Sequence, residues 1–225
     1  MSKLVWDQVG DHFYETGVDK VVLFPMSGES SKSSSDSAYG KGVAWNGITQ
    51  VSESRSGADE TKLYANNNKY LGLRAVEEFG GTITAYTYPD EWKLCDGSAS
   101  PVAGLTLGQQ ARKPFGLAYR TLIGNDTEGD SLGYILHLVY NSTASPSNRD
   151  YSTKNDSPEA VEFSWEFTST PVAVTGYAPT CCLEIDSRTV SADKLKKIED
   201  SLYGTENTES KLMTPDEVIA ALKAA

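Results

Sequence analysis

The most regular alternation of apolar and polar positions in the chain runs from Glu159 to Val174. Its apolar positions are Val161, Phe163, Trp165 and Phe167, and the polar positions between them are Glu162, Ser164, Glu166 and Thr168. A period of two is typical of a β-strand with one buried face and one solvated face. Burying four such side chains contributes roughly 6–12 kcal/mol, which is comparable with the net stability of a whole domain. We therefore expect this strand to face a core.

Other stretches with β-forming residues predict further strands. They cover residues 21–24, 43–51, 82–88, 113–123, 134–140 and 181–185. Residues 70–78 fit either a helix or a strand, and the alternation of Leu71, Leu73 and Ala75 favours a strand. A segment rich in Asp, Asn and Gly at 124–133 predicts a hairpin between the strands on either side of it. Gly80-Gly81 is expected to turn the chain.

Polar stretches and helix signals complete the predicted architecture. Long loops are expected at about 27–42, 52–68 and 141–158. Pro89 and the two acids after it predict a short helix after Tyr88. The apolar face of a first C-terminal helix, from Ser191 to the stop at Gly204, comprises Leu195, Ile198 and Leu202. A second C-terminal helix is predicted by the N-cap Thr214, by Pro215 and by the capping-box residue Glu217. Its apolar residues are Val218, Ile219 and Leu222.

These elements predict a mainly β (α+β) fold in a single domain, residues 1–225. We expect a β-sandwich body over residues 1–190 and a helical segment over residues 191–225. At least one of the polar stretches 27–42 and 52–68 is expected to become ordered only against a neighbouring subunit.

Composition excludes several classes of function. The 225 residues have a formal net charge of −11, so the protein is not expected to bind nucleic acid by neutralising phosphates. No apolar run approaches the roughly 20 residues of a transmembrane helix, and the first residues lack the apolar run of a signal peptide. The cysteines Cys95, Cys181 and Cys182 have no metal-ligand spacing, and we expect free thiols.

The sequence contains no convincing catalytic constellation. His12 and His137 are the two histidines, and we interpret His137 as a core or interface residue because it lies within a predicted strand. Asp126, Glu128 and Asp130 alternate as in a calcium-binding loop, but the sixth position is not glycine and the twelfth is not glutamate. Neither a nucleophile elbow nor a phosphate-binding loop is present. We expect no enzyme activity, no catalytic residues, no bound metal and no cofactor.

Short segments, in order along nearly the whole chain, carry a family resemblance. They are residues 42–47 (GVAWNG), 77–80 (EEFG), 85–91 (AYTYPDE), 115–127 (FGLAYRTLIGNDT), 137–140 (HLVY), 144–147 (ASPS), 155–160 (NDSPEA), 163–166 (FSWE), 170–172 (TPV) and 215–218 (PDEV). Together they resemble the major tail protein, or tail tube protein, of long-tailed, non-contractile bacteriophages.

The resemblance implies a structural virion protein of the phage tail, assembled in the host cytoplasm. It implies a β-sandwich with a small helix, polymerised as stacked hexameric rings into a hollow tube. The implied partners are further copies of the chain, a tape-measure protein, and the tail terminator and baseplate proteins. DNA would pass through the lumen into the host without specific binding. No membrane association and no enzyme activity are implied.

Charge suggests which residues face such a lumen. An acidic wall keeps DNA sliding, but screening limits the repulsion to about 8 Å, so the acids must lie on the wall itself. The candidate lumen-lining acids are Glu77, Glu78, Glu162 and Glu166. The alternative is that these are solubilising charges on the outer surface. The competing interpretation of the whole chain is a monomeric β-sandwich module that binds a carbohydrate or a receptor, displayed on a virion.

Overall fold

The computed structural model describes residues 4–26, 39–153, 156 and 160–223. Most of the expected loop 27–42, part of the loop 141–158 and Glu159 lie outside these residues. The strands are β1 (Tyr14–Pro25), β2 (Val43–Ala44), β3 (Ile48–Gly57), β4 (Glu60–Ala65), β5 (Asn68–Arg74), β6 (Glu77–Ala85), β7 (Phe115–Asn125), β8 (Gly129–Ala144), β9 (Phe163–Ser169), β10 (Val172–Val174), β11 (Tyr177–Thr180) and β12 (Cys182–Asp186). The helices are α1 (Trp92–Asp96), α2 (Ala192–Tyr203) and α3 (Pro215–Lys223).

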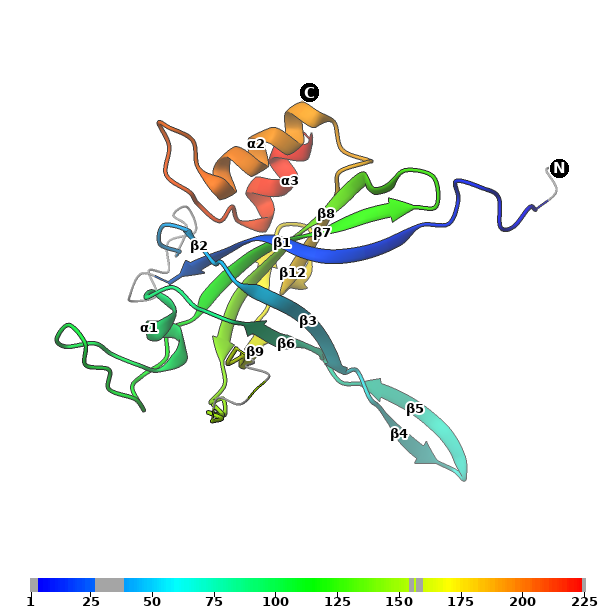
Figure 1. Ribbon diagram of the computed structural model, residues 1–225. Coiled ribbons are helices and arrows are strands. Elements are labelled where there is room, and N and C mark those ends of the chain that lie inside the picture. Colours follow the sequence, from blue (N-terminus) through cyan, green and yellow to red (C-terminus); the bar gives the residue numbers. More distant parts are fainter. Residues whose placement is uncertain (1–3, 27–38, 154–155, 157–159, 224–225) are drawn as a thin grey trace.

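Eight strands form one antiparallel sheet. The order is β2-β1-β7-β8-β9-β6-β3, with β12 also paired to β8. The sheet curves so that the half made by β1, β7 and β8 and the half made by β9, β6 and β3 enclose a common core (Figure 1). The expected mainly β fold with three helices is confirmed, and the two layers of its body are halves of a single sheet.

The core between the two sheet halves is rich in aromatic side chains. Trp45, Trp92 and Trp165 meet there, with ring centroids 4.6–5.7 Å apart. Trp165 and Phe167 of β9 are buried, as their alternation predicts. Such tilted and edge-to-face contacts stabilise a core beyond the area that the rings bury.

A second core lies on the other face of β1, β7 and β8, beneath α2 and α3 (Figure 1). Val22 and Phe24 of β1 belong to this core, whereas Val21 and Leu23 belong to the inner one. Successive side chains of a strand point to opposite faces. The apolar run in β1 is therefore continuous because both of its faces are covered.

The C-terminal helices form where their capping signals predict. In α3, the Thr214 hydroxyl accepts from the Glu217 amide at 3.3 Å, and the Glu217 carboxylate accepts from the Thr214 amide at 2.7 Å. This reciprocal pair is a capping box. In α2, the three predicted apolar residues Leu195, Ile198 and Leu202 are all buried. Within the described residues, no helix is long and apolar enough to cross a membrane.

The prediction that Val161 belongs to the core is wrong. Val161 is 37% exposed and precedes β9, which begins at Phe163. Pairing with β6 ends at Phe163 opposite Ala85, so no neighbouring strand continues beside Val161. Phe163 is only half-buried, and the centroid of its ring lies 5.3 Å from the centroid of the Tyr88 ring.

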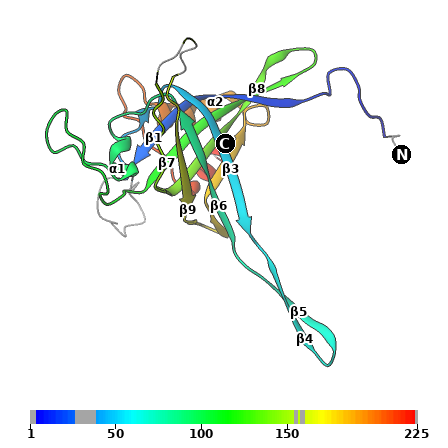
Figure 2. The same cartoon turned by 60° about the horizontal axis from the view of Figure 1, so that its bottom comes forward.

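The prediction of a loop at residues 52–68 is also wrong. Its first part extends β3 to Gly57, and the rest forms the hairpin β4–β5, which projects from the body (Figures 1 and 2). Asn66 and Asn67 both have positive φ, at 51° and 60°, as a tight hairpin turn requires. The sequence is polar because this ribbon packs against neither core, so it lacks the apolar face that marks a buried strand.

The glycine pair Gly80-Gly81 does not turn the chain but lies inside β6. A Cβ on Gly80 would lie 2.5 Å from the Phe167 carbonyl oxygen, and one on Gly81 would lie 2.2 Å from the Ser52 carbonyl oxygen. The glycines therefore allow β3, β6 and β9 to approach closely.

Candidate functional site

The outward face of β3, β6 and β9 is a continuous polar surface. Strand register aligns its side chains in rows: Gln50, Thr84 and Ser164; Ser52, Thr82 and Glu166; Ser54, Gly80 and Thr168; and Ser56 beside Glu78. We call these residues the polar face. The opposite side chains of the same strands, among them Phe79, Ile83 and Trp165, lie in the inner core. Alternation along each strand thus separates a hydroxyl-rich wall from an aromatic core.

The polar face contains carboxylates but no lysine or arginine. Within the described part of the chain, no ion pair involves Glu78 or Glu166. Their charge is therefore not cancelled locally, and the surface carries a net negative field over its hydroxyl groups.

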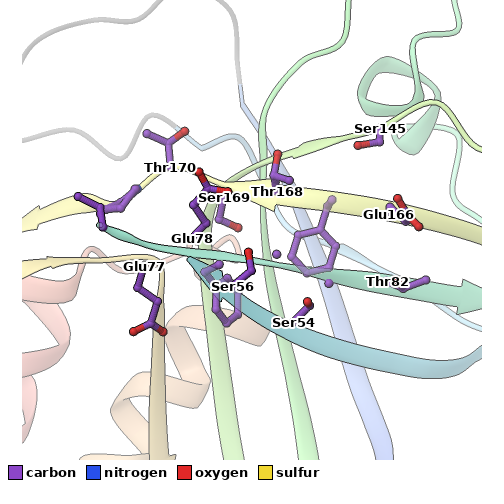
Figure 3. Close-up of a pocket in the computed structure, with 16 residues that line it drawn as sticks. Ser54, Ser56, Glu77, Glu78, Thr82, Ser145, Glu166, Thr168, Ser169 and Thr170 are labelled. Carbon is purple, nitrogen blue, oxygen red and sulfur yellow. The ribbon is translucent and has the colours of Figure 1, made fainter. Parts of the chain in front are cut away.

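A groove of about 650 Å³ lies over β6 on this side of the sheet. Ser54 and Ser56 line it from β3, and Glu166 and Thr168 line it from β9 (Figure 3). Gly80, which adds no side chain to the middle of this surface, is among the residues that line the groove. Its lining offers many hydroxyl oxygens and the carboxylates of Glu77, Glu78 and Glu166, but no histidine or thiol.

The structure places the four predicted acids in different settings. Glu78 and Glu166 belong to the polar face, on adjacent strands. Glu77 also borders the groove, but its carboxylate points away from the labelled serine and threonine side chains (Figure 3). Glu162 precedes β9 and accepts a hydrogen bond from the Thr49 hydroxyl at 2.6 Å. All four are exposed.

The hairpin β4–β5 is amphipathic. Leu63 lies opposite Leu71, and Leu73 lies opposite Thr61, so the three leucines share one face, which we call the leucine face. Leu63, Leu71 and Leu73 are 41%, 47% and 51% exposed. The other face carries charge, including Lys62 and Arg74. An apolar face that is held away from the body is typical of a surface that contacts a partner.

The N-terminal segment is a second projection with exposed apolar side chains (Figure 1). These are Leu4, Val5, Trp6, Val9 and Phe13. Asp126 anchors the segment, because it accepts from the Gly10 amide at 3.0 Å and lies 3.0 Å from His12 Nδ1. Asp130 accepts from the Tyr14 hydroxyl at 2.8 Å. Two of the acids that alternate like a calcium loop, Asp126 and Asp130, thus bind the N-terminal segment and the first residue of β1.

The thiols are not placed for nucleophilic chemistry. All three cysteines are free, as expected. Burial raises the pKa of the Cys95 thiol to about 12, and burial together with the nearby Glu53 raises the pKa of Cys182 to about 11. Because the thiolate is the reactive form, these groups are inert at neutral pH. His137 is buried, in agreement with its interpretation as a core or interface residue.

The polar face could be predicted only in part from the sequence. Serines 52, 54 and 56 alternate with Val51, Glu53 and Arg55, and this period of two was the available signal. The signal is weak because serine is common in loops and two of the three alternate positions are charged. Neither comparison with protein-family models nor comparison with curated protein sequences gives a match for this chain.

Proposed function

We propose that the protein is the tail tube subunit of a long-tailed, non-contractile phage. It assembles as hexameric rings, and the rings stack into a hollow tube that conducts DNA from the virion into the host. The proposal rests on the segments that resemble this family and on one structural observation. That observation is the polar face, which is acidic, rich in hydroxyl groups and without lysine or arginine, on a subunit that also exposes apolar projections.

The polar face suits the wall of a DNA channel. Duplex DNA carries one negative charge per roughly 1.7 Å of its axis, and lysine or arginine on the wall would bind its phosphates. Glu78 and Glu166 instead repel the phosphates at short range, within the screening length of about 8 Å. Serine and threonine hydroxyls keep the wall hydrated without adding charge. In this arrangement Glu78 and Glu166 line the channel, whereas Glu77 and Glu162 lie at its margin.

Assembly accounts for the apolar projections. The leucine face would be buried against a neighbouring copy, as would the exposed side chains of the N-terminal segment. Within the described residues β3 pairs with β6 alone, so one long edge of the sheet is open to another chain. Pairing such edges around a ring removes them. The tape-measure protein and the tail terminator and baseplate proteins are the further partners that this function requires.

The alternative function, a monomeric carbohydrate- or receptor-binding module, requires an exposed aromatic platform. Trp45, Trp92 and Trp165 are instead packed in the inner core. Tyr64 and Tyr70 are exposed on the projecting hairpin, and Tyr64, which directly follows Leu63, points to the face opposite the leucines. Because aromatic and aliphatic side chains are exposed together there, the hairpin fits a protein contact better than a sugar site.

Negative-stain electron microscopy of the purified protein tests the proposal. Rings or tubes with a central channel are expected, either spontaneously or after addition of a tail-initiation complex from the same phage. Small monodisperse particles under both conditions would contradict the proposal and favour the binding module. A variant with the polar face intact but residues 60–74 replaced by a short Gly-Ser turn provides the matched control, since it should remain monomeric.

A further inference from the structure

Three potential metal ligands converge at the seam where the two halves of the folded sheet meet. Glu184 of β12 lies directly opposite His137 of β8, and Glu53 reaches them from β3 in the other half. The ligand atoms of the three residues lie within 4.8 Å of one another. Glu53 points away from the polar face, so this cluster is separate from the proposed channel wall.

His137 is held in one orientation with one ring nitrogen free. The residue is 8% exposed. Its ring stacks on Tyr119, with centroids 4.6 Å apart and planes inclined by 5°. The Nε2 atom lies 3.0 Å from the Thr121 hydroxyl oxygen. The Nδ1 atom is buried and has no hydrogen-bond partner among the residues that the structure describes, which is a costly arrangement for a polar atom.

The free nitrogen is directed at the carboxylates. His137 Nδ1 lies 3.7 Å from Glu53 Oε1. When Nε2 carries the proton and donates to Thr121, Nδ1 presents a lone pair toward the cluster. This is the arrangement in which a second hydrogen bond fixes the tautomer and the orientation of a metal-binding imidazole.

Both carboxylates are also positioned for binding. The Tyr119 hydroxyl donates to Glu53 Oε1 at 2.5 Å, which orients that side chain. The Glu184 side chain is 48% exposed, so the cluster is open to solvent on its side and water can complete a coordination shell.

We propose that Glu53, His137 and Glu184 bind a zinc ion. One imidazole nitrogen, two carboxylate oxygens and water form a ligand set that suits Zn²⁺. Tetrahedral bonds of about 2.1 Å place ligand atoms about 3.4 Å apart. His137 Nδ1 and Glu53 Oε1 are 3.7 Å apart, and since all three ligand atoms lie within 4.8 Å of one another, zinc binding would draw them together by at most about 1.4 Å. This proposal revises the expectation from the sequence that no metal binds.

Arg55 neutralises the carboxylates when zinc is not bound. Its guanidinium donates to Glu184 Oε1 at 3.1 Å and lies 3.7 Å from Glu53 Oε2. The Arg55 side chain is half-exposed, so it can turn into solvent when a cation enters. Arginine and zinc therefore compete for the same two carboxylates.

Bound zinc would join β3 to β8 and β12 across the seam. Because no described strand pairs with the outer edge of β3, such a cross-link would hold the open edge of the sheet against the opposite half. Zinc is thus expected to stabilise the folded subunit whether or not the subunit forms a tube.

Zinc titration of the full-length chain tests the proposal. After treatment with EDTA and dialysis, one Zn²⁺ per chain should bind by isothermal titration calorimetry. At saturating zinc the Tm should rise by about 5 °C or more. Glu184→Gln changes a half-exposed side chain and should weaken binding by about tenfold or more. His137→Gln should weaken binding similarly, and Arg55→Gln should strengthen it.

His12→Gln is the control, because His12 is the other histidine and pairs with an acid outside the cluster; its zinc affinity should equal that of the wild type. Absence of zinc binding, or wild-type affinity in Glu184→Gln or His137→Gln, would overturn the site. Wild-type affinity in Arg55→Gln would overturn the competition between arginine and zinc and with it the proposed arrangement.

Discussion

The leucine face of the hairpin allows the assembly proposal to be tested with a defined magnitude. Full burial of a leucine side chain contributes about 1.5–3 kcal/mol. Leu63, Leu71 and Leu73 remain about half exposed in the subunit, so burying the rest contributes about 1 kcal/mol each. Changing all three to serine should therefore remove about 3 kcal/mol from each hairpin contact, which corresponds to about a 150-fold loss of affinity.

Sedimentation velocity measures this loss as the rise in protein concentration needed for assembly. The triple variant should need at least 100-fold more protein, while its subunit keeps the wild-type Tm because the hairpin packs against neither core. The control is Lys62→Ser with Arg74→Ser, which changes the charged face of the same hairpin. Assembly of the triple variant at the wild-type protein concentration would refute the reasoning. So would an equal rise, in the control variant, of the protein concentration needed for assembly.

Three further predictions concern the core, the channel wall and acid stability. Trp165→Ala should lower the free energy of unfolding by about 3–5 kcal/mol, because Trp165 is fully buried, and a denaturant titration measures this. Glu78→Lys with Glu166→Lys should leave assembly intact but make purified tubes retain DNA at low salt in a filter-binding assay. The Arg120 guanidinium holds the pKa of Asp19 below its usual value. The stability that this ion pair contributes is therefore present above about pH 4 and is lost as the pH falls further. A plot of Tm against pH should accordingly be flatter for Asp19→Asn than for the wild type.

Local signals were sufficient for the helices and for strands with a buried face. The capping box at Thr214 and Glu217 predicts α3 because it is formed by residues three apart. Trp165 and Phe167 alternate because their strand covers a core on one side only. In both cases the sequence signal that predicts the structure lies within a few residues of chain.

The errors arise where distant residues decide the outcome. Val161 continues the apolar alternation, but it is exposed because its neighbouring strand ends at Ala85. The hairpin has no buried face in the subunit, so apolar periodicity could not reveal it. The zinc ligands come from three strands far apart in sequence, and only the folding of the sheet brings β3 onto β8 and β12. Pairwise spacing along the chain contains no signal for such a site.

The departure of the hairpin from the body has a consequence for the geometry of any assembly. Between the body and the hairpin, the Ala58 amide donates to the Val76 carbonyl oxygen and the Ala75 amide donates to the Asp59 carbonyl oxygen, so the two connecting segments are paired with each other. At this junction Gly57 has φ of +79° and Ala58 has φ of 57°. A Cβ on Gly57 would lie 2.6 Å from the Val76 carbonyl oxygen. The direction of the hairpin is thus fixed by a glycine that lies outside the leucine face. The angle between neighbouring subunits, and with it the curvature of a ring, would be encoded at a joint within the subunit rather than at the surface where two subunits meet.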